Sequence, residues 1–182
     1  MPHTPRPAPS PELLARAARI RLACFDVDGT LTDGRLYIAA DGTETKAFHV
    51  HDGLGISLLR RAGITVAFVT ARTSPAAEIR ARDLGAEAHT GIKDKSACVE
   101  GLRGRLGLAA DEVAFMGDDL TDIAVLAAAG LAAAPADAQP AILPHVHWQS
   151  TRRGGDGAAR EFCELLLAAR GAAGGDAAGA GQ

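Results

Sequence analysis

The sequence predicts an α/β fold in which a mostly parallel β-sheet is flanked by helices on both faces. Short apolar runs alternate with longer amphipathic segments along most of the 182 residues. The clearest runs are almost entirely apolar, which is typical of strands buried on both faces of a sheet. Because a helical segment follows most of the strand candidates, the order indicates βαβ units and parallel pairing.

The expected elements follow one another at short intervals. Buried strands are expected at residues 20–25 (IRLACF), 65–69 (TVAFV) and 113–116 (VAFM). Shorter or weaker strands are expected at 86–89, 131–134 and 146–148. Helices are expected over 53–62, 74–84, 94–106, 122–129 and 160–169. Ser74 and Pro75 mark the start of the second helix, because serine caps a helix N-terminus and proline fits the first turn.

The chain is expected to form a single domain over residues 12–170 with a small β-hairpin at about 34–50. The hairpin is indicated by Asp41-Gly42, a strong turn signal between two strand candidates. Residues 1–11 are rich in proline and predict a flexible arm. Residues 171–182 are rich in glycine and alanine with nothing to bury, and predict a disordered tail.

Composition excludes several classes of protein. An apolar content of 47% with 23% charged residues supports one core and excludes general disorder. A net charge of -3 and only 4% aromatic residues predict no nucleic-acid partner and no membrane surface. No apolar run reaches the roughly 18–20 residues that cross a bilayer, and the N-terminus lacks the apolar core of a secretory signal. Cys24, Cys98 and Cys163 lie far apart, which favours a reducing cytoplasm over a disulfide scaffold.

Polar side chains follow the strand candidates at the edge of the sheet where ligands of α/β proteins bind. The four segments are DVDGTLTD (26–33), TAR (70–72), GIKDK (91–95) and GDDLTD (117–122). Together they bring carboxylates, a hydroxyl and cations to one edge. This convergence is the main sequence evidence for an active site.

The residue types at this edge suit phosphoryl chemistry. The carboxylates of Asp26, Asp28 and Asp118 would repel one another without a cation, and an all-oxygen ligand set suits Mg²⁺. Thr70, Lys95 and the backbone N–H groups after Asp28 are expected to bind phosphoryl oxygens. An aspartate can attack phosphorus to form an aspartyl-phosphate, which makes Asp26 the candidate nucleophile. Asp28 is the candidate general acid and base.

Each of these features also has a purely structural interpretation. Acidic turns after strands are common, and Asp118 and Asp119 are favoured near a helix N-terminus. Lys95 could be a surface lysine and Thr70 a helix cap. The complete set, in this order after buried strands, favours the functional interpretation.

The motifs resemble those of the haloacid dehalogenase superfamily of phosphohydrolases, which implies a Rossmann-like fold. The resemblance implies that Asp26 is the nucleophile, that Asp28 is the general acid/base, and that Thr70 and Lys95 bind phosphate. The Mg²⁺ ligands that it implies are Asp26, the Asp28 carbonyl and Asp118, with Asp119 and Asp122 in support.

A narrower resemblance concerns the segment between the first motif and the second strand. Many members insert a cap domain there, whereas this sequence has only the hairpin and AFHVHDGLGISLL (47–59). This layout, with GGDGAAREFCELLL (154–167), is similar to the capless 3-deoxy-D-manno-octulosonate 8-phosphate phosphatase subfamily. The resemblance implies a phosphorylated sugar-acid substrate, a role in lipopolysaccharide synthesis and a homotetramer. An open active site and a small hairpin with unpaired edges independently favour assembly.

The substrate-binding candidates lie in the segment after the hairpin and around the second strand. They are His49, Val50, His51, Asp52, Gly53, Ser57, Arg72 and Arg80. The structural alternatives are that the histidines lie at an exposed strand end, that Asp52 caps its own helix, and that Arg80 is a solvated surface charge.

Other functions stay open at this point. One is the same reaction on a nine-carbon, sialic-acid-type 9-phosphate. Another is an oligomerisation module without catalytic activity, although every expected catalytic residue is present. Phosphoryl transfer to an acceptor other than water is a third, because an aspartyl-phosphate could be intercepted.

Overall fold

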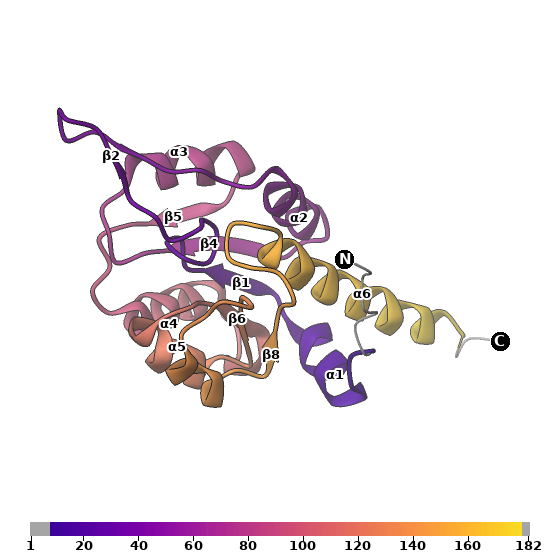
Figure 1. The fold of residues 1–182 in the computed structure, drawn as a ribbon. Coiled ribbons are helices and arrows are strands. Elements are labelled where there is room, and N and C mark those ends of the chain that lie inside the picture. The colour runs from indigo at the N-terminus through magenta and orange to yellow at the C-terminus, as the bar shows by residue number, and fades with distance from the viewer. Residues whose placement is uncertain (1–7, 180–182) are drawn as a thin grey trace.

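The structure, a computed structural model, describes residues 8–179, and their side chains as far as residue 171. Within these residues one parallel sheet has the strand order β5-β4-β1-β6-β7-β8 (Figure 1). Its strands are β1 (Leu22–Phe25), β4 (Thr65–Val69), β5 (Glu87–His89), β6 (Val113–Met116), β7 (Leu131–Ala134) and β8 (Trp148–Gln149). The predicted α/β class is therefore confirmed. Because β1 lies between β4 and β6, the chain crosses from one half of the sheet to the other beside the end of β1.

Helices cover both faces of this sheet, as the continuous apolar runs predict. They are α1 (Pro11–Arg19), α2 (Val50–Arg61), α3 (Pro75–Leu84), α4 (Lys95–Leu106), α5 (Ile123–Ala128) and α6 (Ala158–Gly179). Alternation along β1 sends Phe25 into the core beneath α1, α2, α3 and α6, and Cys24 into the core beneath α4 and α5. Both strand residues are fully buried, so β1 holds the site from the middle of the molecule.

The observed strands follow the prediction most closely at the centre of the sheet. The strands β4, β6 and β7 have the expected limits. The strand β1 begins two residues later than predicted, because Ile20 ends α1 as its C-cap. The helix α3 begins as predicted, with the Ser74 hydroxyl accepting a 3.2 Å hydrogen bond from the Ala77 N–H.

The helix α1 is absent from the sequence prediction, which places residues 1–11 in a flexible arm. Ser10 caps it by accepting a 3.2 Å hydrogen bond from the Leu13 N–H, and Pro11 occupies its first turn. The helix packs against α6, which buries Ala17. Pro11 therefore belongs to a packed helix, and residues 1–7 of the expected arm lie outside the described residues.

The hairpin and the last helix also differ in extent from the prediction. The hairpin strands are only β2 (Tyr37–Ile38) and β3 (Glu44–Thr45), and the hairpin projects from the body at the upper left of Figure 1. Val50 belongs to α2 rather than to a strand, because His49 caps that helix. The helix α6 continues to Gly179, past its expected end at residue 169 and into the segment predicted to be disordered. Alanine, which is abundant there, has the highest helix propensity.

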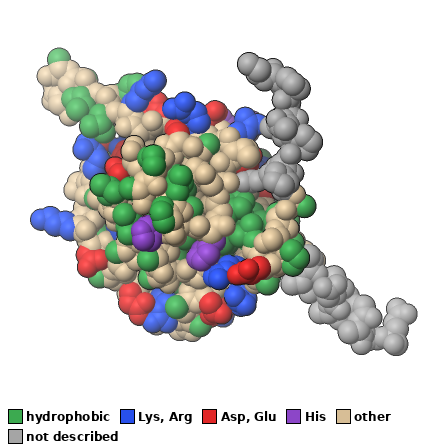
Figure 2. Space-filling model, turned by 60° about the horizontal axis from the view of Figure 1, so that its bottom comes forward, with side chains coloured by type: hydrophobic (Ala, Val, Ile, Leu, Met, Phe, Trp, Pro, Cys, Tyr) green, Lys and Arg blue, Asp and Glu red, His purple; other side chains and the backbone are tan. Residues whose placement is uncertain are grey.

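Two observations concern the helices and the surface of the described residues. No described helix combines the length and the apolar character that crossing a bilayer requires. Figure 2 shows basic and acidic side chains interspersed over one face of the molecule rather than gathered into a single positive field.

Asp52 joins α2 to the start of α6. Its carboxylate is buried and accepts hydrogen bonds from the backbone N–H groups of Gly157 at 3.4 Å and Arg160 at 2.7 Å. Asp52 thus caps a helix more than a hundred residues away. Since His49 is the N-cap of α2, the interpretation of Asp52 as a cap of its own helix is wrong, and its substrate contact stays a prediction.

Replacing Asp52 by alanine is expected to lower the free energy of unfolding by about 1–3 kcal/mol, because the α6 N–H groups lose their buried acceptor. Asp52→Asn keeps one acceptor oxygen and is expected to lose less. Urea unfolding followed by circular dichroism measures both. If both variants unfold at the wild-type midpoint, Asp52 does not hold this helix.

Candidate active site

The predicted site residues gather where β1, β4 and β6 end. Asp26 follows β1, Thr70 follows β4, and Asp118 follows β6 after one glycine. Lys95 is the first residue of α4, whose cap Asp94 accepts a 2.9 Å hydrogen bond from the Ala97 N–H. Asp26, Thr70 and Lys95 are all buried, so the groups meet in a site with restricted access to water.

Lys95 bridges two of the carboxylates. Its ammonium Nζ lies 2.8 Å from Asp26 Oδ1 and 2.6 Å from Asp122 Oδ1. Burial lowers the pKa of Lys95, but the charges of Asp26 and Asp122 outweigh this effect and raise it. Lys95 is therefore a charged, oriented donor beside the candidate nucleophile, in agreement with its predicted phosphate-binding role.

A glycine allows Asp118 to reach this cluster. Gly29 has φ +89°, and a Cβ atom there would lie 2.1 Å from Asp118 Oδ2. The Thr30 hydroxyl donates a 3.3 Å hydrogen bond to Asp118 Oδ1. The backbone of the first motif therefore has to lack a side chain at residue 29 so that the carboxylates from β1 and β6 can meet.

Asp122 and Asp119 shape the loop that carries Asp118, and Asp122 is also a member of the carboxylate cluster. Asp122 Oδ2 accepts hydrogen bonds from the N–H groups of Asp118 at 3.0 Å and Asp119 at 3.2 Å, while its Oδ1 contacts Lys95. Asp119 Oδ1 accepts a 2.7 Å hydrogen bond from the Leu120 N–H. Both residues fold the loop after β6, consistent with the supporting roles expected of them.

The cluster fits a divalent cation with oxygen ligands. One carboxylate oxygen from each of Asp26, Asp118 and Asp122 lies within 4.8 Å of the other two. Burial, with the charge of Asp122, raises the pKa of Asp26 from 3.8 to about 6. Burial, with the charges of Asp26 and Asp122, raises the pKa of Asp118 from 3.8 to about 8. The carboxylates thus destabilise one another when ionised, and Mg²⁺ is the hard cation that this donor set suits.

These shifts predict how pH and Mg²⁺ together affect stability. Without metal, the folded protein keeps protons on Asp26 and Asp118 that the unfolded chain has released, so stability falls as pH rises from about 4 toward about 8. Mg²⁺ binds the deprotonated carboxylates, so it has to displace these protons. Its affinity is therefore expected to increase as pH rises and the protons are lost. The increase in Tm on adding Mg²⁺ is expected to be larger at pH 8 than at pH 6, measured by differential scanning fluorimetry. A larger increase at the lower pH would contradict the assignment.

Asp28 lies in a separate group of charges that the sequence reasoning missed in part. Lys46 donates from Nζ to Asp28 Oδ1 and lies 2.9 Å from Glu44 Oε1. Arg72, a predicted substrate residue, pairs with Glu44 and has its Nε 4.0 Å from Asp28 Oδ2. Burial alone would lower the pKa of Lys46. The hydrogen bonds to Asp28 and Glu44 outweigh this effect, and the pKa lies above the ordinary lysine value. Glu44 lies in the hairpin strand β3 and Lys46 directly follows that strand, and no sequence motif includes either residue.

Three of the predicted substrate contacts are occupied within the chain. Asp52 caps α6, as described above. Arg80 lies over the Phe48 ring, with its Cζ 5.9 Å from the ring centroid, and a Cβ atom on Gly53 would lie 2.1 Å from Arg80 Nη2. These side chains, with His49, line a space of only about 10 Å³. They pack the amino end of α2 against α3, and their role as substrate contacts stays a prediction.

The remaining substrate candidates stay predictions. His49 caps α2 through Nδ1, which accepts a 3.2 Å hydrogen bond from the His51 N–H, and the two rings lie edge to face with centroids 4.9 Å apart. Val50 is 76% exposed, and Ser57 is half-buried further along α2. Thr70 is buried, and its hydroxyl accepts a 3.3 Å hydrogen bond from the Arg72 N–H.

The larger cavity lies beside the loop that carries the first motif. It has a volume of about 300 Å³ and is lined by Asp33, Arg35, Asp137, Arg153, Gly154, Gly155 and Asp156. Gly155 donates a 3.1 Å hydrogen bond from its N–H to the Thr30 carbonyl, which attaches this wall to the site. The glycine-rich segment that begins at residue 154 is visible in the sequence, but only the fold places it against residues 29–33.

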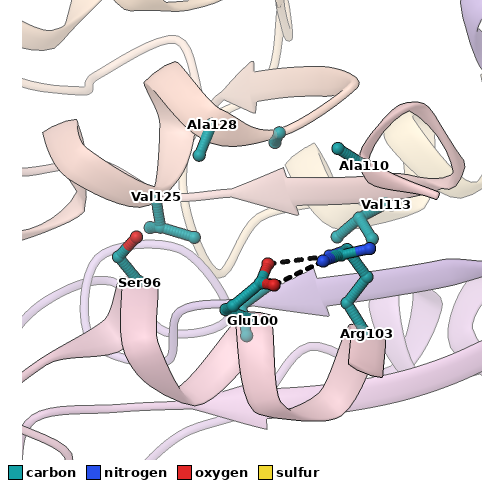
Figure 3. A pocket seen from close by; sticks show the side chains of 9 residues that line it. Ser96, Glu100, Arg103, Ala110, Val113, Val125 and Ala128 are labelled. Atoms are coloured by element: carbon teal, nitrogen blue, oxygen red, sulfur yellow. Dashed lines mark hydrogen bonds and ion pairs between the residues drawn. The ribbon is translucent and has the colours of Figure 1, made fainter. Parts of the chain in front are cut away.

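A smaller cavity lies away from the carboxylates, between α4, α5 and the amino end of β6 (Figure 3). Its volume is about 50 Å³, and the charged pair on its wall, Glu100 and Arg103, is self-neutralising. Ligand sites of proteins usually exceed roughly 300 Å³, so this cavity is too small for a sugar phosphate.

Comparison with known proteins agrees with this site. Residues 89–162 match a family model described as haloacid dehalogenase-like hydrolase. The 3-deoxy-D-manno-octulosonate 8-phosphate phosphatase KdsC of Yersinia pestis is 42% identical over 160 residues, which cover 87% of this chain and 86% of that protein.

Solved structures give the same result. A hypothetical protein from Xanthomonas campestris has a TM-score of 0.89 and 50% identity, with 100% of both chains covered. The 3-deoxy-D-manno-octulosonate 8-phosphate phosphatase of Moraxella catarrhalis, in complex with magnesium, phosphate and a KDO molecule, has a TM-score of 0.86 and 38% identity. That match covers 88% of this chain and 92% of the other. The chain belongs to the haloacid dehalogenase-like hydrolases and, within them, to the 3-deoxy-D-manno-octulosonate 8-phosphate phosphatase family.

Proposed function

We propose that this phosphatase hydrolyses 3-deoxy-D-manno-octulosonate 8-phosphate to the free sugar acid and inorganic phosphate, with Mg²⁺ as cofactor. The observation that carries the proposal is the buried Asp26 carboxylate, 2.8 Å from Lys95 Nζ and clustered with Asp118. The relatives with this name and the related structure that contains magnesium and KDO support the substrate and the metal.

In the first half of the reaction Asp26 attacks phosphorus. A bond forms between its carboxylate oxygen and phosphorus while the bond from phosphorus to the sugar oxygen breaks, and Asp28 gives that oxygen a proton. Lys95 and the backbone N–H groups of the first motif hold the phosphoryl oxygens. When bound, Mg²⁺ adds positive charge that offsets the repulsion between the carboxylates and the phosphate.

In the second half Asp28 acts as a base. It takes a proton from a water molecule, whose oxygen attacks phosphorus and breaks the bond to Asp26. Inorganic phosphate is released and the Asp26 carboxylate is restored. Lys95, fixed between Asp26 and Asp122, keeps the nucleophile oriented through both halves.

The cavity of about 300 Å³ beside the first motif supports a small sugar-acid substrate. Arg35 and Arg153 are the cations on its wall that a substrate carboxylate would meet, and each would exchange its present partner, Asp33 or Asp137, for that carboxylate. Purified protein with Mg²⁺ should release phosphate from the octulosonate 8-phosphate with a kcat/KM at least about tenfold above that for a nine-carbon 9-phosphate. A preference for the nine-carbon ester would reverse the substrate assignment. A folded oligomer inactive on both would favour the non-catalytic module.

The assembly proposed is a homotetramer joined through the hairpins. Leu36, Tyr37 and Ile38 are 47%, 42% and 63% exposed on this projecting element, which is an unusual concentration of apolar surface. A neighbouring subunit that covers this surface would also restrict water at an active site without a cap domain. The free thiols Cys24, Cys98 and Cys163 support the proposed cytoplasmic location.

Replacing Ile38 by aspartate is expected to dissociate the tetramer, because a charge would be buried at the contact. Native mass spectrometry of wild type and variant measures the change. Ile79→Asp, on α3 and 50% exposed, is the matched control and should leave the tetramer intact. A wild-type protein that is monomeric at assay concentration would contradict the proposed assembly.

A further inference from the structure

Lys46 is a buried cation outside every motif of the sequence. Its side chain is only 1% exposed, although the residue directly follows the hairpin strand β3. The ammonium donates to Asp28 Oδ1 and lies 2.9 Å from Glu44 Oε1. Burying a lysine ammonium is costly unless carboxylates pair with it, so the burial of Lys46 depends on the charges around it.

The hairpin strand supplies that arrangement. Side chains alternate along a strand, so Glu44 and Lys46 point to the same side while Thr45 is exposed. Arg72 pairs with Glu44 from the end of β4. The result is a group of two carboxylates and two cations, neutral overall, of which Asp28 is the member nearest the reaction.

Within this group the two oxygens of Asp28 are not equivalent. Lys46 holds Oδ1, whereas Oδ2 is buried without a hydrogen-bond partner among the described residues. Arg72 approaches this oxygen without a hydrogen bond, with its Nε 4.0 Å away. A buried carboxylate oxygen without a partner is unfavourable, which indicates that a group from the substrate completes it.

We propose that Lys46 is a positioning residue for proton transfer, which holds Asp28 by Oδ1 so that Oδ2 faces the leaving oxygen of the phosphate ester. This inference rests on the proposed function. Through Lys46 and Glu44 the hairpin completes the acid/base arrangement.

The test compares two phosphate esters that differ in their need for a proton. A sugar or other alkyl leaving group requires a general acid, whereas p-nitrophenolate leaves without one. Lys46→Met is expected to lower kcat/KM by about 100-fold or more on the sugar phosphate and by less than about 5-fold on p-nitrophenyl phosphate. The ratio of the two values is independent of how much of the variant is folded, because both esters are hydrolysed by the same active fraction.

Three further variants complete the experiment. Lys46→Arg keeps the charge and should move the ratio back toward the wild-type value. Asp28→Asn, which removes the acid itself, should change the ratio in the same direction as Lys46→Met. Arg61→Met, at an exposed cation at the C-terminal end of α2 and outside the site, should leave the ratio and the rates unchanged.

The outcomes separate this inference from the proposed function. If the wild type hydrolyses both esters and Lys46→Met loses the same factor on each, Lys46 merely attaches the hairpin and the inference is overturned. An unchanged Lys46→Met enzyme overturns it as well. If the wild type hydrolyses neither ester, the proposed function fails first, and the inference fails with it.

Discussion

Replacing Asp26 by asparagine is expected to lower kcat at least about 10⁴-fold, because the amide cannot attack phosphorus. The change is nearly isosteric at a residue that is only 6% exposed, so the packing around β1 is retained. Asp122, 2.6 Å from Lys95 Nζ, remains in the variant as a partner for that ammonium group. Release of phosphate from the octulosonate 8-phosphate with Mg²⁺ measures the loss.

The same variant should not be less stable than the wild type in the absence of metal. Burial and the charge of Asp122 raise the pKa of Asp26 to about 6, so its ionised carboxylate destabilises the fold above that pH. Asp83→Asn, at an exposed carboxylate on α3 outside the site, is the control for the substitution itself and should retain most of the activity. An Asp26→Asn enzyme that kept more than a trace of turnover would place the nucleophile elsewhere.

Removal of divalent cations is expected to lower the rate at least about 10³-fold. Without a cation, a phosphate ester would meet the clustered carboxylates of Asp26, Asp118 and Asp122. Burial and the charges of Asp26 and Asp122 already raise the pKa of Asp118 to about 8. Dialysis against EDTA followed by assay measures the loss. Titration with Mg²⁺ should restore the rate with the same concentration dependence as the rise in Tm.

EDTA already saturated with Mg²⁺ is the control for effects of the chelator itself, and it should leave the rate unchanged. Asp118→Asn should require more Mg²⁺ for half-maximal activity, because it removes a charged ligand from the cluster. An enzyme that was indifferent to EDTA would show that the carboxylate cluster does not act through a metal.

The central strands were predictable because local pattern and tertiary environment agree there. The continuous apolar runs of β4, β6 and β7 match strands buried on both faces, and their limits come directly from the sequence. The helix α1 carried an equivalent signal, since Ser10-Pro11 repeats the Ser74-Pro75 pattern at the start of α3. The proline-rich residues before it obscured that signal.

The site was predictable where its residues follow strands, and unpredictable where it depends on distant contacts. Asp26, Thr70 and Asp118 meet because the ends of parallel neighbouring strands meet. Lys46 reaches Asp28 only because the chain returns from the hairpin past the first motif. Asp52 caps a helix that lies more than a hundred residues further along the chain. No local spacing encodes either contact. The packing of Arg80 on Phe48 likewise depends on the approach of α3 to α2.

The central claim is that Asp26 becomes phosphorylated in each catalytic cycle. Beryllium fluoride forms a stable mimic of a phosphoryl group on a nucleophilic carboxylate, so a crystal structure of the Mg²⁺-loaded protein with this reagent tests the claim most directly. The account predicts beryllium bonded to a carboxylate oxygen of Asp26, with Lys95 in contact with a fluoride. Beryllium bonded to Asp28, Asp118 or any other side chain would contradict it.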